Sequence, residues 1–180
     1  SVYFYKGGLY LTQRRLDKAE EAFNKAIYLD PDSSLPYHAL ARLYLMDDDA
    51  NKAINRYKTI IKKKSDQTVP HQTTPDMILG LIYSLKKQFD LSEKHYRAAL
   101  AINPDFALAA NNLAYLLAEQ GHNYDEALTL ALKATQQKPD DPLIKDTLGW
   151  IYYKKGNYEK AVQLLSESIE KIHSNSTLQY

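Results

Sequence analysis

The chain contains no cysteine, so disulfide bonds and thiolate chemistry are excluded, and the redox state of its compartment is not indicated. It has no run of about 18 apolar residues, so no segment is suited to span a bilayer. It also lacks a charge imbalance, because 23 basic residues are interspersed with 22 acidic ones and the formal net charge is +1. This balance favours neither nucleic acid nor an anionic membrane as a partner.

Signatures of catalysis and of metal binding are also missing. The 5 histidines include no pair spaced three or four residues apart, so a zinc site of the His-x-x-x-His type is absent. No nucleophile elbow, phosphate-binding loop or dinucleotide-binding fingerprint occurs. We therefore expect no catalytic residue, no metal site and no cofactor in this chain.

The sequence does contain a pattern that recurs about every 34 residues. A small residue, an aromatic or bulky apolar residue and a second small residue follow one another at three- or four-residue spacing, and a proline closes the best copies. These copies are Ala19-Phe23-Ala26-Pro31, Ser92-Tyr96-Ala99-Pro104 and Ala127-Ala131-Ala134-Pro139, with weaker ones at Ala53-Tyr57-Ile60 and Ala161-Leu165-Ser168. The regular return of the pattern predicts a fold built from similar units.

A second pattern lies upstream of each copy and has a small residue at its centre. These residues are Gly7, Ala41, Gly80, Ala114 and Gly149. Apolar residues three and four apart lie on one stripe of a helix, so each unit predicts two helices, A and then B, whose stripes face each other. A glycine inside a helix costs roughly 1 kcal/mol relative to alanine. We therefore expect the small residues to mark the closest approach of helix A to helix B.

Together the two patterns resemble the tetratricopeptide repeat (TPR). The resemblance implies an all-α fold, a right-handed α-solenoid of about five helix-turn-helix repeats that forms a single domain over residues 1–180. The expected repeats cover 1–33, 34–67, 73–106, 107–141 and 142–175, with an insertion at 68–72 and the start of a truncated sixth repeat at 176–180. We therefore expect the chain to be a piece of a longer array.

In TPR arrays the A helices line a concave groove that binds peptide segments of partner proteins, and the resemblance extends this expectation to the present chain. Fixed positions of each helix A should point into the groove. The candidate residues are His38, Arg42, Met46, Met77, Leu81, Asn111, Asn112, Tyr115, Asp146, Trp150, Tyr153 and Lys154. The set includes the only Trp and both Met of the chain, and these residue types are common at protein-binding surfaces.

Asn112 is the sharpest candidate, because an amide can donate to and accept from a ligand's peptide backbone at once. In the alternative, Asn111 and Asn112 bond neighbouring helices and Trp150 packs partly against the adjacent repeat. Some TPR domains grip acidic chaperone tails with a carboxylate clamp, but only Asn112 matches the positions of such a clamp here. His38 and Arg42, one helical turn apart, predict a local cationic spot.

The sequence favours a non-enzymatic adaptor that binds a peptide segment of a partner protein. Two alternatives stay open: a substrate-selecting arm of a larger enzyme such as a glycosyltransferase, and a homo-oligomer formed through uncapped terminal repeats. The second would use apolar residues exposed at Tyr3, Tyr10, Ile169 and Ile172. Repeats four and five resemble those of bacterial TPR proteins, some of which are envelope lipoproteins. This implies a bacterial scaffold and favours the periplasm or envelope over the cytoplasm.

Overall fold

The computed structural model describes residues 1–46, 50–63, 73–121 and 123–177, and all regular structure in these ranges is helical. The described residues form ten helices: α1 (Val2–Thr12), α2 (Leu16–Leu29), α3 (Ser34–Met46), α4 (Ala50–Lys63), α5 (Thr74–Leu85), α6 (Phe89–Ile102), α7 (Ala107–Gln120), α8 (Tyr124–Gln137), α9 (Pro142–Lys154) and α10 (Tyr158–Thr177). The expected all-α class is confirmed. The insertion expected at 68–72 lies outside the described residues.

Each of the five expected repeats contains one A helix and one B helix. The A helices are α1, α3, α5, α7 and α9, and each is followed by its B helix. Helix α10 has 20 residues and runs to Thr177. Ser176 and Thr177, which were expected to open a sixth repeat, therefore continue α10, because no proline or glycine interrupts the helix before them. Residues 178–180 of that segment lie outside the described part.

The chain forms two compact units, Ser1–Pro104 with helices α1 to α6 and Asp105–Tyr180 with helices α7 to α10. The single domain expected over residues 1–180 stays a prediction. The boundary follows Pro104, which comes directly after the residue that caps α6. Each unit has its own buried apolar residues, and each is described by itself below.

Three A–B pairs show the close approach that was predicted at the small residues. A Cβ atom added to Gly7 would lie 2.4 Å from the Phe23 ring, and one added to Gly80 would lie 2.4 Å from the Tyr96 ring. At Gly149 the added atom would lie 2.9 Å from Cγ of Leu165. Close-packed interiors do not tolerate such distances. Glycine is therefore required where α1 meets α2, where α5 meets α6 and where α9 meets α10.

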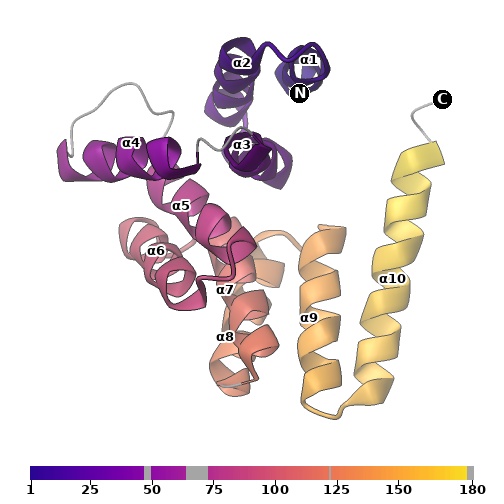
Figure 1. The fold of residues 1–180 in the computed structure, drawn as a ribbon. Helices are drawn as coiled ribbons and strands as arrows, with labels where there is room; N and C mark the ends of the chain where they lie inside the picture. The colour runs from indigo at the N-terminus through magenta and orange to yellow at the C-terminus, as the bar shows by residue number, and fades with distance from the viewer. Residues whose placement is uncertain (47–49, 64–72, 122, 178–180) are drawn as a thin grey trace. The chain divides into compact units, whose positions relative to one another are not determined.

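Helices α3 and α4 depart from the hairpin that was predicted for every repeat. Helix α4 makes few contacts with α3 and packs mainly on α5. Figure 1 shows α3 end-on but α4 along its length, so the two helices cross. The contact that the structure records between α3 and α4 runs through Tyr44 and Tyr57, whose hydroxyl oxygens lie 3.0 Å apart and whose ring centroids lie 5.9 Å apart.

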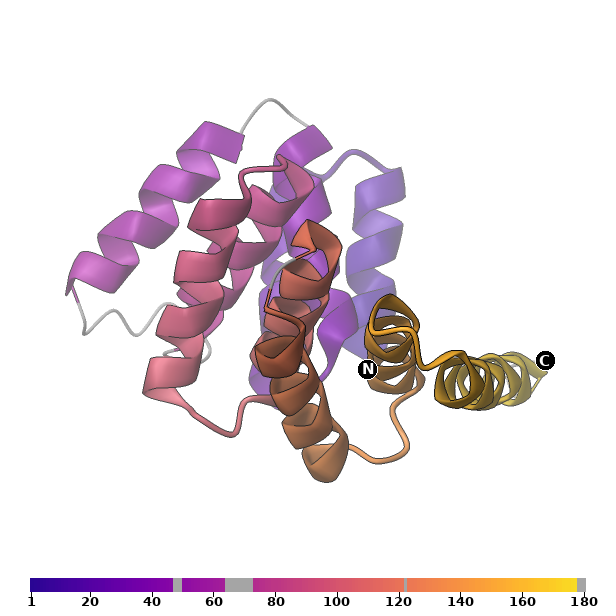
Figure 2. The same cartoon turned by 90° about the horizontal axis from the view of Figure 1, so that it is seen from below.

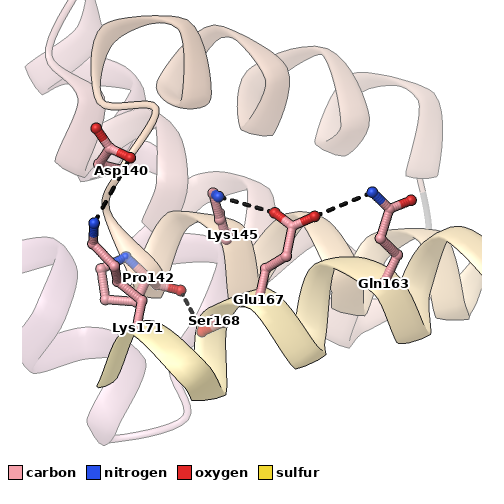
Figure 3. A network of polar contacts seen from close by, with 7 residues as sticks. All are labelled: Asp140, Pro142, Lys145, Gln163, Glu167, Ser168 and Lys171. Atoms are coloured by element: carbon pink, nitrogen blue, oxygen red, sulfur yellow. Dashed lines mark hydrogen bonds and ion pairs between the residues drawn. The ribbon is translucent and has the colours of Figure 1, made fainter. Parts of the chain in front are cut away.

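In the second unit, α9 and α10 are neighbours along their length (Figures 1 and 2). A polar network joins them (Figure 3): Glu167 accepts hydrogen bonds from Lys145 Nζ at 2.9 Å and from Gln163 Nε2 at 3.1 Å. The buried Ser168 hydroxyl donates to the Pro142 carbonyl oxygen at 2.7 Å. Among the described residues, no other helix packs on the opposite face of α10. Its exposed apolar residues are Tyr158, Val162, Ile169 and Ile172.

Candidate functional site

The predicted site residues on α5 are not accessible. Met77 is 0% exposed and Leu81 is 3% exposed. Helix α5 is buried from Thr74 to Tyr83 because α3, α4 and α6 all pack on it. A side chain in this position offers no surface to a partner, so Met77 and Leu81 are excluded from the candidate site.

The predicted residues on α3 are accessible but less cationic than the sequence suggested. Met46 is 69% exposed and Arg42 is exposed as well. Burial, and after it the charge of Arg42, hold the pKa of His38 below its ordinary value of 6.5. The lowered pKa disfavours the protonated form of His38, so Arg42 supplies most of the positive charge of the expected cationic spot.

The remaining predicted residues lie together on two A helices of the second unit. We call this surface the α7–α9 face; it consists of Asn111, Asn112, Tyr115 and Glu119 on α7 and Asp146, Trp150, Tyr153 and Lys154 on α9. The two helices contact each other. Within each helix the members are adjacent or lie three or four residues apart, which places them on the same side.

Trp150 is held in one orientation by three neighbours on the α7–α9 face. Its indole Nε1 donates a hydrogen bond to Oε1 of Glu119 at 2.7 Å. The ammonium group of Lys154 lies 4.7 Å from the centroid of the Trp150 ring and 4.0 Å from the same Glu119 oxygen. Tyr153 stacks on Trp150 with 5.3 Å between ring centroids, and Tyr158 lies 5.6 Å beyond Tyr153. The result is a row of three aromatic rings, of which Tyr153 and Tyr158 are exposed.

Tyr115 and Asp146 form the part of the face next to this row. Tyr115 is 46% exposed, and its pKa is raised above 10.0 by partial burial and then by the negative charges of Glu119 and Asp146. Partial burial also raises the pKa of Asp146. Among the described residues, no cation pairs with Asp146 and no side chain or backbone group forms a hydrogen bond with it. Its carboxylate therefore has unused acceptor capacity.

The two adjacent asparagines also have unused hydrogen-bonding groups. Oδ1 of Asn111 is buried without a partner among the described residues. The half-buried amide of Asn112 has no hydrogen bond to any residue in the described part of the chain. Within those residues, the alternative in which both amides bond neighbouring helices is not observed.

The repeat register places Glu119 among the groove positions of helix A, but Glu119 was not among the selected candidates, although its carboxylate orients Trp150 and faces Lys154. A signal for it was present. Glu119 and Lys154 are the penultimate residue of α7 and the last residue of α9, and they carry opposite charges at matching positions of consecutive A helices. Opposite charges at such positions on neighbouring helices favour contact.

Among the described residues, no group of three or more His, Asp or Glu side chains is arranged so that it could hold a metal ion. None of the described helices combines the length and the apolar character needed to cross a membrane.

Comparison with known proteins finds the same repeat along the chain. Four family models, each of a tetratricopeptide repeat, match residues 1–33, 22–55, 79–142 and 122–179. A TPR repeat-containing protein of Pseudomonas aeruginosa is 31% identical over 164 residues, which cover 87% of this chain and 26% of that protein. The chain spans between 11% and 30% of the length of the curated relatives that it matches.

Solved structures share the fold. A TPR protein from Thermus thermophilus has a TM-score of 0.66 and 21% identity, with 98% of this chain and 93% of that chain covered. YrrB, a TPR protein described as having an unusual peptide-binding site, has a TM-score of 0.59 and 21% identity, with 97% and 90% covered. The repeat pattern, the paired helices and the family matches agree over most of the sequence, and the chain therefore belongs to the tetratricopeptide repeat family.

Proposed function

We propose that this chain is a non-enzymatic adaptor that binds a peptide segment of a partner protein along the α7–α9 face. The observation that carries the proposal is the amide of Asn112, which has no hydrogen-bond partner among the described residues and lies on the same α7–α9 face as an oriented aromatic row. An amide of this kind can donate to and accept from the backbone of an extended segment.

The aromatic row supplies the apolar part of such an interaction. Large, rigid aromatic side chains provide contact area and lose little conformational entropy on binding. The bond from Trp150 to Glu119 fixes the indole ring before any partner arrives, which lowers the ordering cost further. The peptide-binding site named for YrrB shows that this fold can serve such a function, and it supports the proposal by analogy.

The test compares the wild-type chain with an Asn112→Ala, Tyr115→Ala, Trp150→Ala triple variant in a pull-down from the source lysate. A Leu132→Ala variant, altered at an exposed position on α8, is the matched control. We expect a protein that the wild type and the control retain and the triple variant loses, and the recovered partner should bind the triple variant at least about tenfold more weakly. Circular dichroism establishes that all three chains are folded. Equal retention by the triple variant would remove the α7–α9 face from the proposal.

Self-association is a second candidate, which the uncovered face of α10 favours. Val162 is 64% exposed and Ile169 is 55% exposed. In the first repeat the residue that corresponds to Ile169 is Ile27 on α2, which is 0% exposed because α3 packs on α2. An apolar position that a neighbouring helix covers in one repeat is thus open on α10, and a second copy of the chain could cover it.

Sedimentation velocity over a range of concentrations tests this candidate. We expect the wild type to shift toward a dimer as the concentration rises, and a Val162→Glu, Ile169→Glu variant to remain a monomer. A chain that stays monomeric at every concentration would reject self-association, and the apolar face of α10 would then need a different explanation.

A further inference from the structure

The α7–α9 face already contains one occupied site for a cation. The Lys154 ammonium lies 4.7 Å from the Trp150 ring centroid and 4.0 Å from Oε1 of Glu119. An aromatic face attracts a cation through its quadrupole, and a carboxylate adds a direct charge interaction. The position of Lys154 therefore indicates that this surface can bind a positively charged group between an aromatic ring and a carboxylate.

The same combination of ring and carboxylate occurs a second time on this face, without a cation. Tyr115 precedes Glu119 by one helical turn on α7, and Asp146 precedes Trp150 by one turn on α9. Glu119 and Trp150 are hydrogen-bonded across α7 and α9, and Tyr115 and Asp146 each lie one turn earlier on these same two helices. Lys154 is engaged with Trp150 and Glu119, and no described cation pairs with Asp146.

We infer that the bound segment carries a basic side chain, lysine or arginine, which lies between Tyr115 and Asp146 on the α7–α9 face. This inference rests on the proposed function and adds the chemistry of the ligand to it. An acidic side chain at the same place would meet the like charges of Asp146 and Glu119. A purely apolar one would cover the exposed Asp146 carboxylate and remove it from water without giving it a partner, which is costly.

Arginine suits the position better than lysine. Its planar guanidinium group can stack on the Tyr115 ring while its N–H groups donate to both carboxylate oxygens of Asp146. Backbone groups of the same segment would then reach the amide of Asn112, which precedes Tyr115 by three residues on α7. The segment would thus be recognised by one basic side chain, one amide contact and the neighbouring aromatic row.

The test uses the fluorescence of Trp150, the only tryptophan in the chain, as a local reporter. The probes are two blocked pentapeptides, Ala-Leu-Arg-Leu-Ala and the same sequence with citrulline in place of arginine. Citrulline keeps the shape of the side chain and removes its charge. We expect the arginine peptide to bind the wild type at least about tenfold more tightly than the citrulline peptide.

An Asp146→Asn variant should reduce this preference to less than about threefold, since it removes the charge and keeps the shape. An Asp140→Asn variant, which neutralises a carboxylate in the connection before α9, should retain the full preference. Equal binding of both peptides, an unchanged preference in Asp146→Asn, or no saturable response to the arginine peptide at millimolar concentration would each overturn the inference.

These outcomes are separate from the test of the proposed function. If the triple variant loses a partner that the wild type retains, but the arginine and citrulline peptides bind equally, the face binds a segment and only the basic side chain is wrong. If the triple variant retains everything, the proposed face itself is wrong.

Discussion

Single hydrogen atoms decide how closely the helices of a repeat can approach. Replacing Gly80 with alanine places a Cβ atom 2.4 Å from the ring of Tyr96, which is 1% exposed and has no room to turn aside. We expect Gly80→Ala to lower the free energy of unfolding by about 1–3 kcal/mol, as measured by urea denaturation.

Gly8 provides the matched control for this prediction. It also lies inside a helix, but no atom is within 4 Å of a Cβ added there. Gly8→Ala should therefore raise the free energy of unfolding by up to about 1 kcal/mol, because alanine favours the helical backbone. Similar changes in the two variants would contradict the packing role of Gly80.

The sequence predicted where site residues lie on their helices more reliably than it predicted their surroundings. The register that selected Asn112 and Trp150 also selected Met77, because all three occupy comparable faces of A helices. Met77 is buried because three helices pack on α5. The periodicity of one segment reveals which side of a helix is apolar, but the number of neighbours around it depends on long-range packing. The bond between Glu119 and Trp150 depends on such packing as well.

At the scale of helices and turns, the predictable features were those with a local cause. Apolar spacing and the helix-stopping prolines indicated the helix pairs. The turn after α9 contains Gly156 with a φ of +79°, a conformation that glycine adopts without strain. The equivalent turns after α1 and α5 place Arg14 and Lys87 in the same left-handed region, at φ of 54° and 57°. Their residue types gave no sign of this conformation, which the packing of the flanking helices imposes.

The whole molecule should respond unevenly to high pH. Burial raises the pKa of Tyr57 to about 12, and it also raises the pKa values of Tyr37, Tyr44 and Tyr96. All four lie in the first unit. In the unfolded chain these tyrosines ionise near their ordinary pKa of 10.0, which is a lower pH than they need in the folded chain. The stability they provide is therefore complete below about pH 10 and is lost as the pH rises toward 12 and above, by about 1.4 kcal/mol per pH unit for each tyrosine.

Absorbance of tyrosinate and fluorescence of Trp150 can be followed together to check this expectation. Tyrosinate absorbance should show a late phase that coincides with loss of helix from the first unit, while Trp150 still reports a folded second unit. A Tyr57→Phe variant should weaken the dependence on pH. Ionisation of every tyrosine near pH 10 with the helices intact would contradict the burial argument.

The contacts group into two compact units, Ser1–Pro104 and Asp105–Tyr180, and the single domain expected from repeat stacking stays a prediction. The repeat pattern predicts how the two helices of a repeat pack on each other and on the next repeat. It does not predict whether some repeats contact each other more extensively than others along the array. The number of repeats could therefore be predicted from the sequence, whereas the division after Pro104 could not.

The pairing of a glycine with a ring also bears on how such a chain can change over evolutionary time. In repeat three the ring is on α6 and its space is on α5, whereas repeat four has alanine on both helices, at Ala114 and Ala131. The two helices of repeat three thus fit each other as a pair. Recombination that joins α5 to a different B helix would leave either a hole or a clash, while exchange of complete repeats would preserve the fit. Duplication of whole repeats is accordingly the route by which this kind of protein can lengthen without losing its core.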